Sequence, residues 1–229
     1  SVSFPAIDKM ITDELAGLGG ASVVLLTSTI TSPTTKQIIT EFLAKYPGSR
    51  HVQFDAVSYS GMLLANEATY GQRVLPSYQL QNANVVVSIG ADFLSTWLNP
   101  VELQRGYSAK RKINQANPEM NKHYQFESMM SMTGANADER FTHRPSETGV
   151  VAAALLSAVN GQGAAGTTGK LKAGIEKAAA ELTANRGKAV VLCGSNNTSI
   201  QIIVNAINEA IGANGTTINF SAPLLTQAR

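Results

Sequence analysis

The sequence has little cysteine, few aromatic residues and no long hydrophobic run, and each shortage excludes a class of protein. Cys193 is the single cysteine among 229 residues, so this chain alone forms neither an internal disulfide nor a cysteine-ligated zinc or iron–sulfur site. No apolar stretch approaches the about 20 residues of a transmembrane helix, so no direct membrane span is expected. Eighteen basic against sixteen acidic residues, without a basic run, give no indication of a nucleic-acid partner.

Recognisable catalytic motifs are also scarce. His51, His123 and His143 are scattered without the spacing of a helical zinc site, and no serine lies in a G-x-S-x-G motif. The glycines at 17, 19 and 20 precede the first expected strand instead of following it, so no dinucleotide-binding G-x-G-x-x-G is present. The N-terminus SVSFPAIDKM has neither an initiator methionine nor a signal-peptide pattern, which indicates a processed protein or a piece of a larger one.

The stretch VVVSIGADFLSTWLNP, residues 85–100, is the centre of the expected fold. Its apolar, β-branched start predicts a strand buried on both faces, and Pro100 after Asn99 predicts the start of a helix. In open α/β sheets ligands bind outside the carboxyl ends of such strands. The segment 90–97 is therefore where a ligand or partner is expected. The alternative is that Phe93 and Trp97 pack over the end of the sheet, in which case Trp97→Ala destabilises the protein by about 3 to 5 kcal/mol.

The spacing of the strands predicts the fold class. Strands that start near residues 22, 50, 84 and 123 are separated by helical patterns, which is typical of an α/β, doubly wound, mostly parallel, Rossmann-like sheet. Residues 129–144 are interpreted as a loop. The expected strands are 22–26, 50–54, 85–89, 124–127, 189–193 and 217–220. The expected helices are 5–18, one from 33 that includes 43, one capped by Ser58 or Ser60 that runs to 68, 100 to about 116, 147–159, 171–184 and 200–211.

A glycine-rich stretch divides the expected fold. Residues 161–168, GQGAAGTT, read as a linker between a main doubly wound domain at 1–160 and a smaller second α/β lobe at 169–229. In the second lobe, the turn GSNNT at 194–198 either cradles an anion or caps a helix, and it lacks the lysine of a nucleotide-binding P-loop. The cluster Lys110-Arg111-Lys112 is interpreted as a solvated face that complements a helix dipole.

Three segments carry a resemblance to a known family: IGADFLSTWLNPVE (89–102), FESMMSMTGANADERFTHRP (126–145) and NAINEAIGANGTTI (205–218). Together they resemble the molybdopterin oxidoreductase family, and most closely its cofactor-free subunit in bacterial alternative complex III, a quinol-oxidising respiratory complex. The resemblance implies a domain in electron transport, with other subunits of a membrane-bound complex as partners, on the periplasmic side of the inner membrane. It also implies that iron–sulfur clusters belong to a separate region.

The family's catalytic members bind a molybdenum bis-molybdopterin guanine dinucleotide through three turns, and this sequence departs from each. Acidic side chains beside a phosphate are unfavourable, and a bulky Phe93 would stand where the backbone approaches it. We therefore expect these positions to be vestigial, with no catalytic residue, no metal site and no cofactor in this chain. Arg140 and Arg144 are expected to pair with Glu127, Asp138 or Glu147. The corresponding positions are Gly90, Ala91, Asp92, Phe93, Glu127, Ser128, Pro145, Ser146, Glu147 and Thr148.

The leading functional hypothesis is a non-catalytic structural or interaction domain of such a redox-complex subunit. The resemblance is to an oxidoreductase subunit, and the chain alone is not expected to be catalytic. Two alternatives stay open: a dinucleotide-arm-binding domain of an active molybdenum bis-pterin oxidoreductase, and a two-lobed small-molecule or nucleotide-binding domain. Cys193, at the end of a β-branched run, is expected to be buried and slow to react with thiol reagents.

Overall fold

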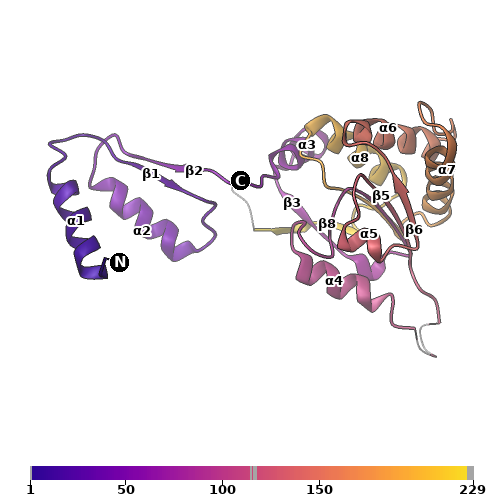
Figure 1. Cartoon of the computed structure of the whole chain (residues 1–229), viewed down its shortest axis with the longest axis horizontal. Coiled ribbons are helices and arrows are strands. Elements are labelled where there is room, and N and C mark those ends of the chain that lie inside the picture. Colours follow the sequence, from indigo (N-terminus) through magenta and orange to yellow (C-terminus); the bar gives the residue numbers. More distant parts are fainter. Residues whose placement is uncertain (1, 114, 116–117, 226–229) are drawn as a thin grey trace. The chain divides into compact units, whose positions relative to one another are not determined.

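The protein is an α/β chain that divides into two compact units. The computed structural model describes residues 2–113, 115 and 118–225. The first unit, called the N-terminal unit below, extends to Val57, and the second, called the main unit, runs from Ser58 to Leu224 (Figure 1). The expected α/β class with parallel strands is confirmed. The helices and strands of each unit are described separately.

The N-terminal unit contains two helices and two strands. They are α1 (Phe4–Ala16), β1 (Val24–Thr27), α2 (Pro33–Ala44) and β2 (Arg50–Gln53). β1 and β2 form a two-stranded parallel sheet. Proline within the first turn starts both helices, because its fixed φ suits that position, and the Ser32 hydroxyl caps α2 by accepting from the Thr35 backbone. No side chain between residues 2 and 57 is buried, so this unit lacks a core of its own.

The main unit is organised around a four-stranded parallel sheet in the order β6-β5-β4-β7. Every residue of β4 and of β7 is buried, as the continuous apolar runs predict. The pairing is in register along β4, with Val85 opposite Lys122 and Ala189, and Ile89 opposite Phe126 and Cys193. The four strands are β4 (Val85–Ile89), β5 (Lys122–Glu127), β6 (Glu139–Thr142) and β7 (Ala189–Cys193).

Helices cover both faces of this sheet. On one face, Tyr107 of α4 contacts His123, and α5 lies against β5 so closely that a Cβ on Gly134 would collide with Glu127. On the other face, Gly174 of α7 touches the ring of Phe141, and α6 packs between α7 and α8. The helices of the main unit are α3 (Ser60–Tyr70), α4 (Pro100–Ala109), α5 (Met132–Ala135), α6 (Thr148–Val159), α7 (Gly169–Ala184) and α8 (Thr198–Ala210), with short 3₁₀ turns η1 (Leu80–Asn82) and η2 (Pro145–Glu147).

A second, antiparallel pair of strands belongs to the main unit. β3 (Leu75–Tyr78) pairs with β8 (Ile218–Leu224), and the register shifts between Leu75 and Ser77. Pro76 lies at this irregularity, where a residue without an N–H is tolerated. The sequence predicted part of β8 but missed β3, because a four-residue strand that contains proline has a weak pattern.

The structure divides the chain at a different position from the one predicted from the sequence. The strands expected near 22 and 50 form a separate sheet and do not join the sheet of β4. Residues 161–168 connect α6 to α7 within the main unit, and β7, from the expected second lobe, pairs directly with β4. The division falls at 57/58 instead. Glycine composition gives local flexibility, but strand pairing decides which segments share a core. The helix that starts at Pro100 ends at Ala109, before the expected end near 116, which itself lies outside the described residues.

Candidate functional site at the carboxyl edge of the main sheet

The carboxyl ends of the four parallel strands meet at one edge of the main sheet, and most predicted site residues follow these ends. The loop after β4 begins at Gly90, whose φ of 66° is in the left-handed region that favours glycine. A Cβ on Gly194, which follows β7, would collide with the Gly90 carbonyl. Glycine is thus required at 194, and the loops after β4 and β7 pack backbone against backbone.

Asp92 joins the loop after β4 to α5. Its Oδ1 accepts hydrogen bonds from the backbone N–H of Thr133 at 3.1 Å and from the Thr133 hydroxyl at 2.8 Å. The same hydroxyl oxygen accepts from the backbone N–H of Leu94 at 3.0 Å. The Asp92 carboxylate therefore has a structural role, because it holds two loops of the carboxyl edge together.

Phe93 does not lie where the family resemblance implied, beside a bound phosphate. Its side chain is fully buried and packs against the rings of Tyr107 and His123, with centroid distances of 5.5 and 5.3 Å. It therefore belongs to the core beneath the loop and does not stand over the loop's outer surface. Trp97 is also buried and contacts the ring of Tyr78 at 5.4 Å. The burial expected for Phe93 and Trp97 is confirmed, but the ring contacts of Phe93 are with α4 and the start of β5, and that of Trp97 is with β3, and none of them is at the carboxyl end of β4.

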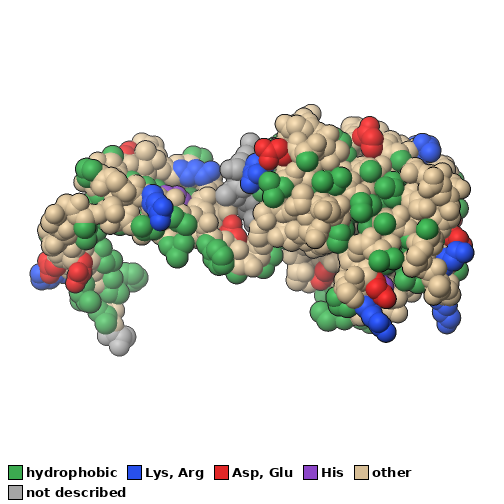
Figure 2. All heavy atoms as spheres, turned by 90° about the horizontal axis from the view of Figure 1, so that it is seen from above, with side chains coloured by type: hydrophobic (Ala, Val, Ile, Leu, Met, Phe, Trp, Pro, Cys, Tyr) green, Lys and Arg blue, Asp and Glu red, His purple; other side chains and the backbone are tan. Residues whose placement is uncertain are grey.

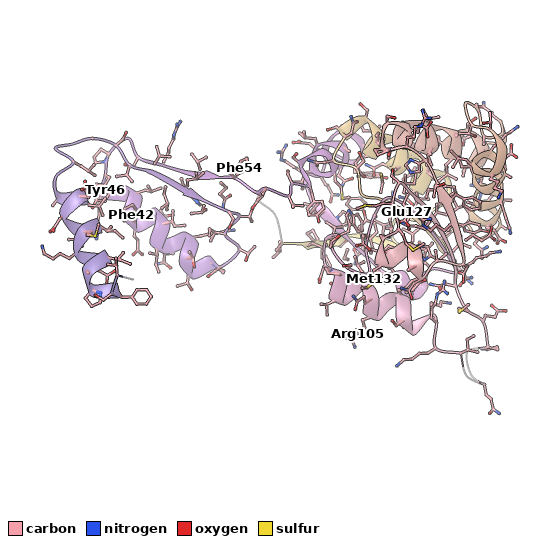
Figure 3. The ribbon with its side chains drawn as sticks, in the orientation of Figure 1. Phe42, Tyr46, Phe54, Arg105, Glu127 and Met132 are labelled. Carbon is pink, nitrogen blue, oxygen red and sulfur yellow. The ribbon has the colours of Figure 1, made fainter. Side chains whose placement is uncertain are left out.

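Glu127, at the end of β5, is the most heavily hydrogen-bonded carboxylate of this edge. It is buried, and its oxygens accept from Arg140 Nε at 2.5 Å, from the Ser131 hydroxyl at 2.6 Å and from Gln125 Nε2 at 3.1 Å. Burial raises the pKa of the Glu127 carboxyl, but the hydrogen bonds from Arg140 and its other partners outweigh this and leave the pKa lowered. Figure 3 labels Glu127 and Met132 in the main unit, where Glu127 is buried and Met132 is 57% exposed.

A buried row of polar side chains runs along β5. His123, Gln125 and Glu127 alternate with Tyr124 and Phe126, so they share one face of the strand. Gln125 links the other two, through its Oε1 to His123 Nε2 at 3.3 Å and through its Nε2 to Glu127. Burial lowers the pKa of His123 to about 4, so the imidazole is neutral at neutral pH. The partners satisfy one another, which is the condition for burying such groups.

The third predicted turn, at residues 145–148, is held by local hydrogen bonds. Pro145 and Ser146 are exposed, and the Glu147 carboxylate accepts the backbone N–H of Arg144 at 2.8 Å. The Thr148 hydroxyl donates to the Pro145 carbonyl at 2.9 Å. The structure therefore brings Asp92 and Glu127 together through α5, while the turn at 145–148 contributes the start of α6. Ala91 is buried and its carbonyl accepts from Ser88, and Ser128 is exposed.

The expected ion pairs form only in part. Arg140 pairs with Glu127 as predicted. Asp138, however, pairs with Arg111, whose two terminal nitrogens lie 3.0 and 2.6 Å from the carboxylate. Arg111 also lies over the ring of Tyr107 at 4.8 Å, so the interpretation of the 110–112 cluster as a solvated face is wrong for this residue. The sequence pattern does not predict the ion pair of Arg111 with Asp138, because the two residues are far apart in the chain.

The turn after β7 caps a helix. Asn197 Oδ1 accepts the backbone N–H of Ile200 at 3.2 Å, which is an N-cap of α8. Asn196 Oδ1 accepts the backbone N–H of Gly61 at 2.8 Å. These contacts support the capping interpretation of GSNNT over the anion cradle. Cys193 beneath it is buried, as expected, and burial raises the pKa of its thiol to about 11.

The described residues offer hollows away from this edge. A hollow of about 600 Å³ lies between the ends of α6 and α7, beside the 161–168 loop, and its lining is largely alanine with Glu176. A second, of about 330 Å³, lies between η1 and α4 and includes Arg105 and Glu102. Within the described ranges no group of three or more His, Cys, Asp or Glu side chains is placed to hold a metal ion, and no helix there is long and apolar enough to cross a membrane.

Comparisons with known proteins give a fold likeness. No protein-family model and no curated protein sequence matches the chain. Among solved structures, the chain is similar to one chain in the crystal structure of the formyltransferase/hydrolase complex FhcABCD from Methylorubrum extorquens in complex with methylofuran, with a TM-score of 0.57 and 14% identity. The match covers 88% of this chain and 55% of that chain. This chain therefore spans about half the length of the similar one, and the likeness shows the fold alone.

These findings contradict the resemblance on which the sequence interpretation relied. The assignment to molybdopterin oxidoreductases, the respiratory chain and alternative complex III is wrong, since no family model matches and the similar structure belongs to a formyltransferase/hydrolase complex. The three segments behind it are generic parts of an α/β fold. The first is a strand, a left-handed glycine turn and a helix start, and the third is the end of α8 with Gly212 and Gly215 at positive φ before β8. Such junctions recur wherever strands and helices alternate.

Proposed function

We propose that this chain is a non-catalytic interaction domain of a larger protein assembly, and that a partner protein binds at the carboxyl edge of the main sheet. The observation that carries the proposal is a group of three exposed methionines, called the methionine group below: Met129, Met130 and Met132. They follow β5, and Met129 is 82% exposed. Methionine is an adaptable apolar side chain that is enriched at protein-binding surfaces.

The loop that carries the methionine group is fixed by hydrogen bonds to Glu127 and Asp92. Between and after the methionines, Ser131 binds Glu127 through its hydroxyl, and Thr133 binds Asp92 through its hydroxyl and backbone. The polar residues of the loop thus point inward while the methionines stay exposed. A loop fixed in this way binds a partner with little loss of backbone entropy, which favours recognition.

Two further observations support binding over catalysis. The carboxylates at this edge, Asp92 and Glu127, are occupied by hydrogen bonds within the chain, so neither is set up as a free acid or base. The similar solved structure is described as a complex, FhcABCD, and a domain of this fold is therefore compatible with multi-subunit assembly.

The test replaces the methionine group by serine and measures assembly. Met129→Ser, Met130→Ser and Met132→Ser are combined in the natural protein, which is purified under native conditions and analysed by native mass spectrometry. We expect loss of a bound partner, at least about tenfold in occupancy, with an unchanged thermal midpoint because the side chains are exposed. Met120→Ser is the matched control, since Met120 is exposed but precedes β5 at the opposite end of the sheet. Unchanged assembly in the triple variant would contradict the proposal.

A small-molecule-binding domain is the second candidate. The hollow of about 600 Å³ between α6 and α7 favours it, because its size is that of ordinary ligand sites. Its alanine-rich lining suits a mainly apolar compound better than a nucleotide. A thermal-shift screen of small apolar compounds tests this candidate, with Ala180→Phe as the variant that fills the hollow. A shift that persists in Ala180→Phe would place binding elsewhere.

A further inference from the structure

The hollow of about 330 Å³ between η1 and α4, called the α4 hollow below, is bordered by charged groups of both signs. Its size is at the lower end of the range of small-ligand sites. Every residue that lines it lies between 78 and 109, so the hollow is formed within the main unit alone. One wall comes from the end of β3 and from η1, and the other comes from α4.

Helix α4 supplies its wall from a single stripe of its surface. Glu102, Arg105 and Ala109 line the hollow, and their spacing of three and seven positions puts them on one face of the helix. Leu103 and Tyr107, on the face that packs into the core, are buried. Core packing of α4 therefore determines that the Glu102 and Arg105 side chains border the hollow.

The opposite wall is fixed by hydrogen bonds and by close packing. The backbone N–H of Gln79 donates to the Thr217 carbonyl at 2.8 Å, and the side chain of Leu80 is fully buried. Gln81 Nε2 donates to Gln79 Oε1 at 2.6 Å. A Cβ on Gly106 would lie 2.9 Å from Gln81 Oε1, so glycine at this position lets α4 approach η1 closely. Walls that are ordered before a ligand arrives reduce the entropy cost of binding.

Two opposite charges border the α4 hollow without neutralising each other. Glu102 and Arg105 are three positions apart on α4, a spacing at which opposite charges often pair. In the part of the chain that the structure describes, however, neither side chain is in an ion pair. Glu102 Oε2 accepts from Asn99 Nδ2 at 2.9 Å, and Glu102 Oε1 has no hydrogen-bond partner among the described residues. One carboxylate oxygen and one guanidinium group are therefore available to a ligand.

The charges on the face of the main unit drawn in Figure 2 are scattered. Basic and acidic side chains lie there singly or in small groups among hydrophobic and uncharged ones, and no large patch of one sign is visible. Such a surface gives no support to a polyanionic partner such as a nucleic acid. A hollow with one charge of each sign instead fits a small ligand that carries both charges.

We propose that the α4 hollow binds a free α-amino acid with an apolar side chain. The Arg105 guanidinium donates two parallel hydrogen bonds to the α-carboxylate, and Glu102 Oε1 accepts from the α-ammonium group. The side chain of the ligand lies along the ring of Tyr78 and beside Ala109, which line the same hollow.

The spacing and sum of the charges favour this class of ligand. Cβ atoms three positions apart on a helix are about 5–6 Å apart, and the two charged groups of an α-amino acid are attached to one carbon atom, so they fit between two such neighbours. A dipeptide separates its two charged groups farther. Because the charges of Glu102 and Arg105 cancel, an uncharged ligand side chain leaves no charge without a partner.

Isothermal titration calorimetry of the purified protein tests the site, with L-leucine and L-phenylalanine as probes. Each has two analogues that lack one charge: 4-methylpentanoate and 3-methylbutylamine for leucine, 3-phenylpropanoate and 2-phenylethylamine for phenylalanine. We expect at least one of the amino acids to bind with a dissociation constant below about 1 mM. Its two analogues should bind at least about tenfold more weakly. No binding of either amino acid at about 10 mM, or an analogue that binds as tightly as its amino acid, would overturn the proposal.

Two variants each remove one charge from the border of the hollow. Arg105→Gln should weaken amino-acid binding about 10- to 100-fold and Glu102→Gln at least about fivefold, because each loses a charge-assisted hydrogen bond to the ligand. Lys170→Gln is the matched control, since Lys170 is an exposed cation of α7 that does not line the α4 hollow. All three side chains are exposed, so the thermal midpoint without ligand should change little. Unchanged affinity in Arg105→Gln or Glu102→Gln, or an equal loss in Lys170→Gln, would overturn the proposal.

Nuclear magnetic resonance locates the bound amino acid. The side-chain amide signals of Gln79 and Gln81 and the backbone amide signal of Gly106 should shift on titration, because these residues line the α4 hollow. The backbone amide signal of Gly163, which lines the hollow between α6 and α7, should not. Any result without shifts at Gln79, Gln81 and Gly106 would overturn the proposal. None of these measurements depends on the methionine group, so this proposal and the proposed partner binding fail independently.

Discussion

Strands β1 and β4 are both short, apolar and paired in parallel, but their surroundings differ. In β4 every residue is buried between β5 and β7 and under helices on both faces. In β1, Val24 and Leu26 are exposed, and β2 is the only strand that pairs with it in the part of the chain that the structure describes. The comparison teaches that residue type is enough to make a strand, whereas a core requires strands on both sides and helices on both faces.

The largest test of this comparison removes one aromatic ring from each unit. Phe93→Ala should lower the free energy of unfolding of the main unit by about 3 to 5 kcal/mol, because a fully buried ring leaves a cavity among Tyr107 and His123. Phe54→Ala, at an exposed position of the N-terminal unit, should change it by less than about 0.5 kcal/mol. Chemical denaturation followed by tryptophan fluorescence measures both, since Trp97 lies in the main unit. Equal losses of unfolding free energy in the two variants would contradict the difference in burial between the two units.

A second test uses the buried histidine of the main unit. Because the folded pKa of His123 is lowered to about 4 from 6.5, the unfolded chain takes up a proton below pH 6.5 that the folded chain does not. The free energy of unfolding should therefore fall by about 3 kcal/mol between pH 6.5 and pH 4. His123→Gln should flatten this slope. His51→Gln, in the N-terminal unit, should leave it unchanged, and a slope that survives in His123→Gln would refute the assignment.

A smaller effect is expected from a single methyl group at the carboxyl edge. Gly134→Ala places a Cβ against the Glu127 carboxylate, and we expect a loss of about 1 to 3 kcal/mol as the Arg140 pair shifts. Gly149→Ala is the matched control. Gly149 lies in α6, the new Cβ would meet Ile200 of α8 at ordinary contact distance, and alanine favours a helix over glycine by up to about 1 kcal/mol. Thermal unfolding measures both. If Gly134→Ala left the free energy of unfolding unchanged, α5 would be able to move away from Glu127 at little cost.

The last test measures the reactivity of a thiol. Cys193 should react with a thiol reagent at least about 100-fold more slowly than a cysteine placed at Thr40 in a Cys193→Ala chain. Burial, which also raises the pKa of the Cys193 thiol to about 11, is the reason. Labelling under native conditions, timed by mass spectrometry, distinguishes the two positions. Fast labelling of Cys193 would show that β7 opens readily.

Local sequence patterns predicted the elements better than their assembly. The β-branched runs of β4 and β7 and the proline starts of α2 and α4 lie where expected, because each depends on neighbouring residues alone. β6 was missed inside a predicted loop, since its sequence ERFT is polar and its stability comes from pairing with β5. Whether a strand joins one sheet or another depends on partners distant in sequence.

The candidate site shows the same limit. Acidic side chains after β4 and β5 could be located by sequence, and the pairing of Arg140 with Glu127 was predicted. The contact of Asp92 with Thr133 could not be, because it joins two loops through a helix of four residues. The methionine group is visible in the sequence as MMSM, but its exposure depends on which neighbours turn inward.

The start of α3 has a mechanical consequence. The Tyr59 hydroxyl accepts the backbone N–H of Leu98 at 2.9 Å, and Gly61 is bonded to Asn196. Leu98 has a φ of 54°, a conformation in which a non-glycine residue stores strain. The first residues after 57/58 are thus attached to the loops after β4 and β7. A pull on the chain at this junction is therefore passed to those two loops through the hydrogen bonds of Tyr59 with Leu98 and of Gly61 with Asn196.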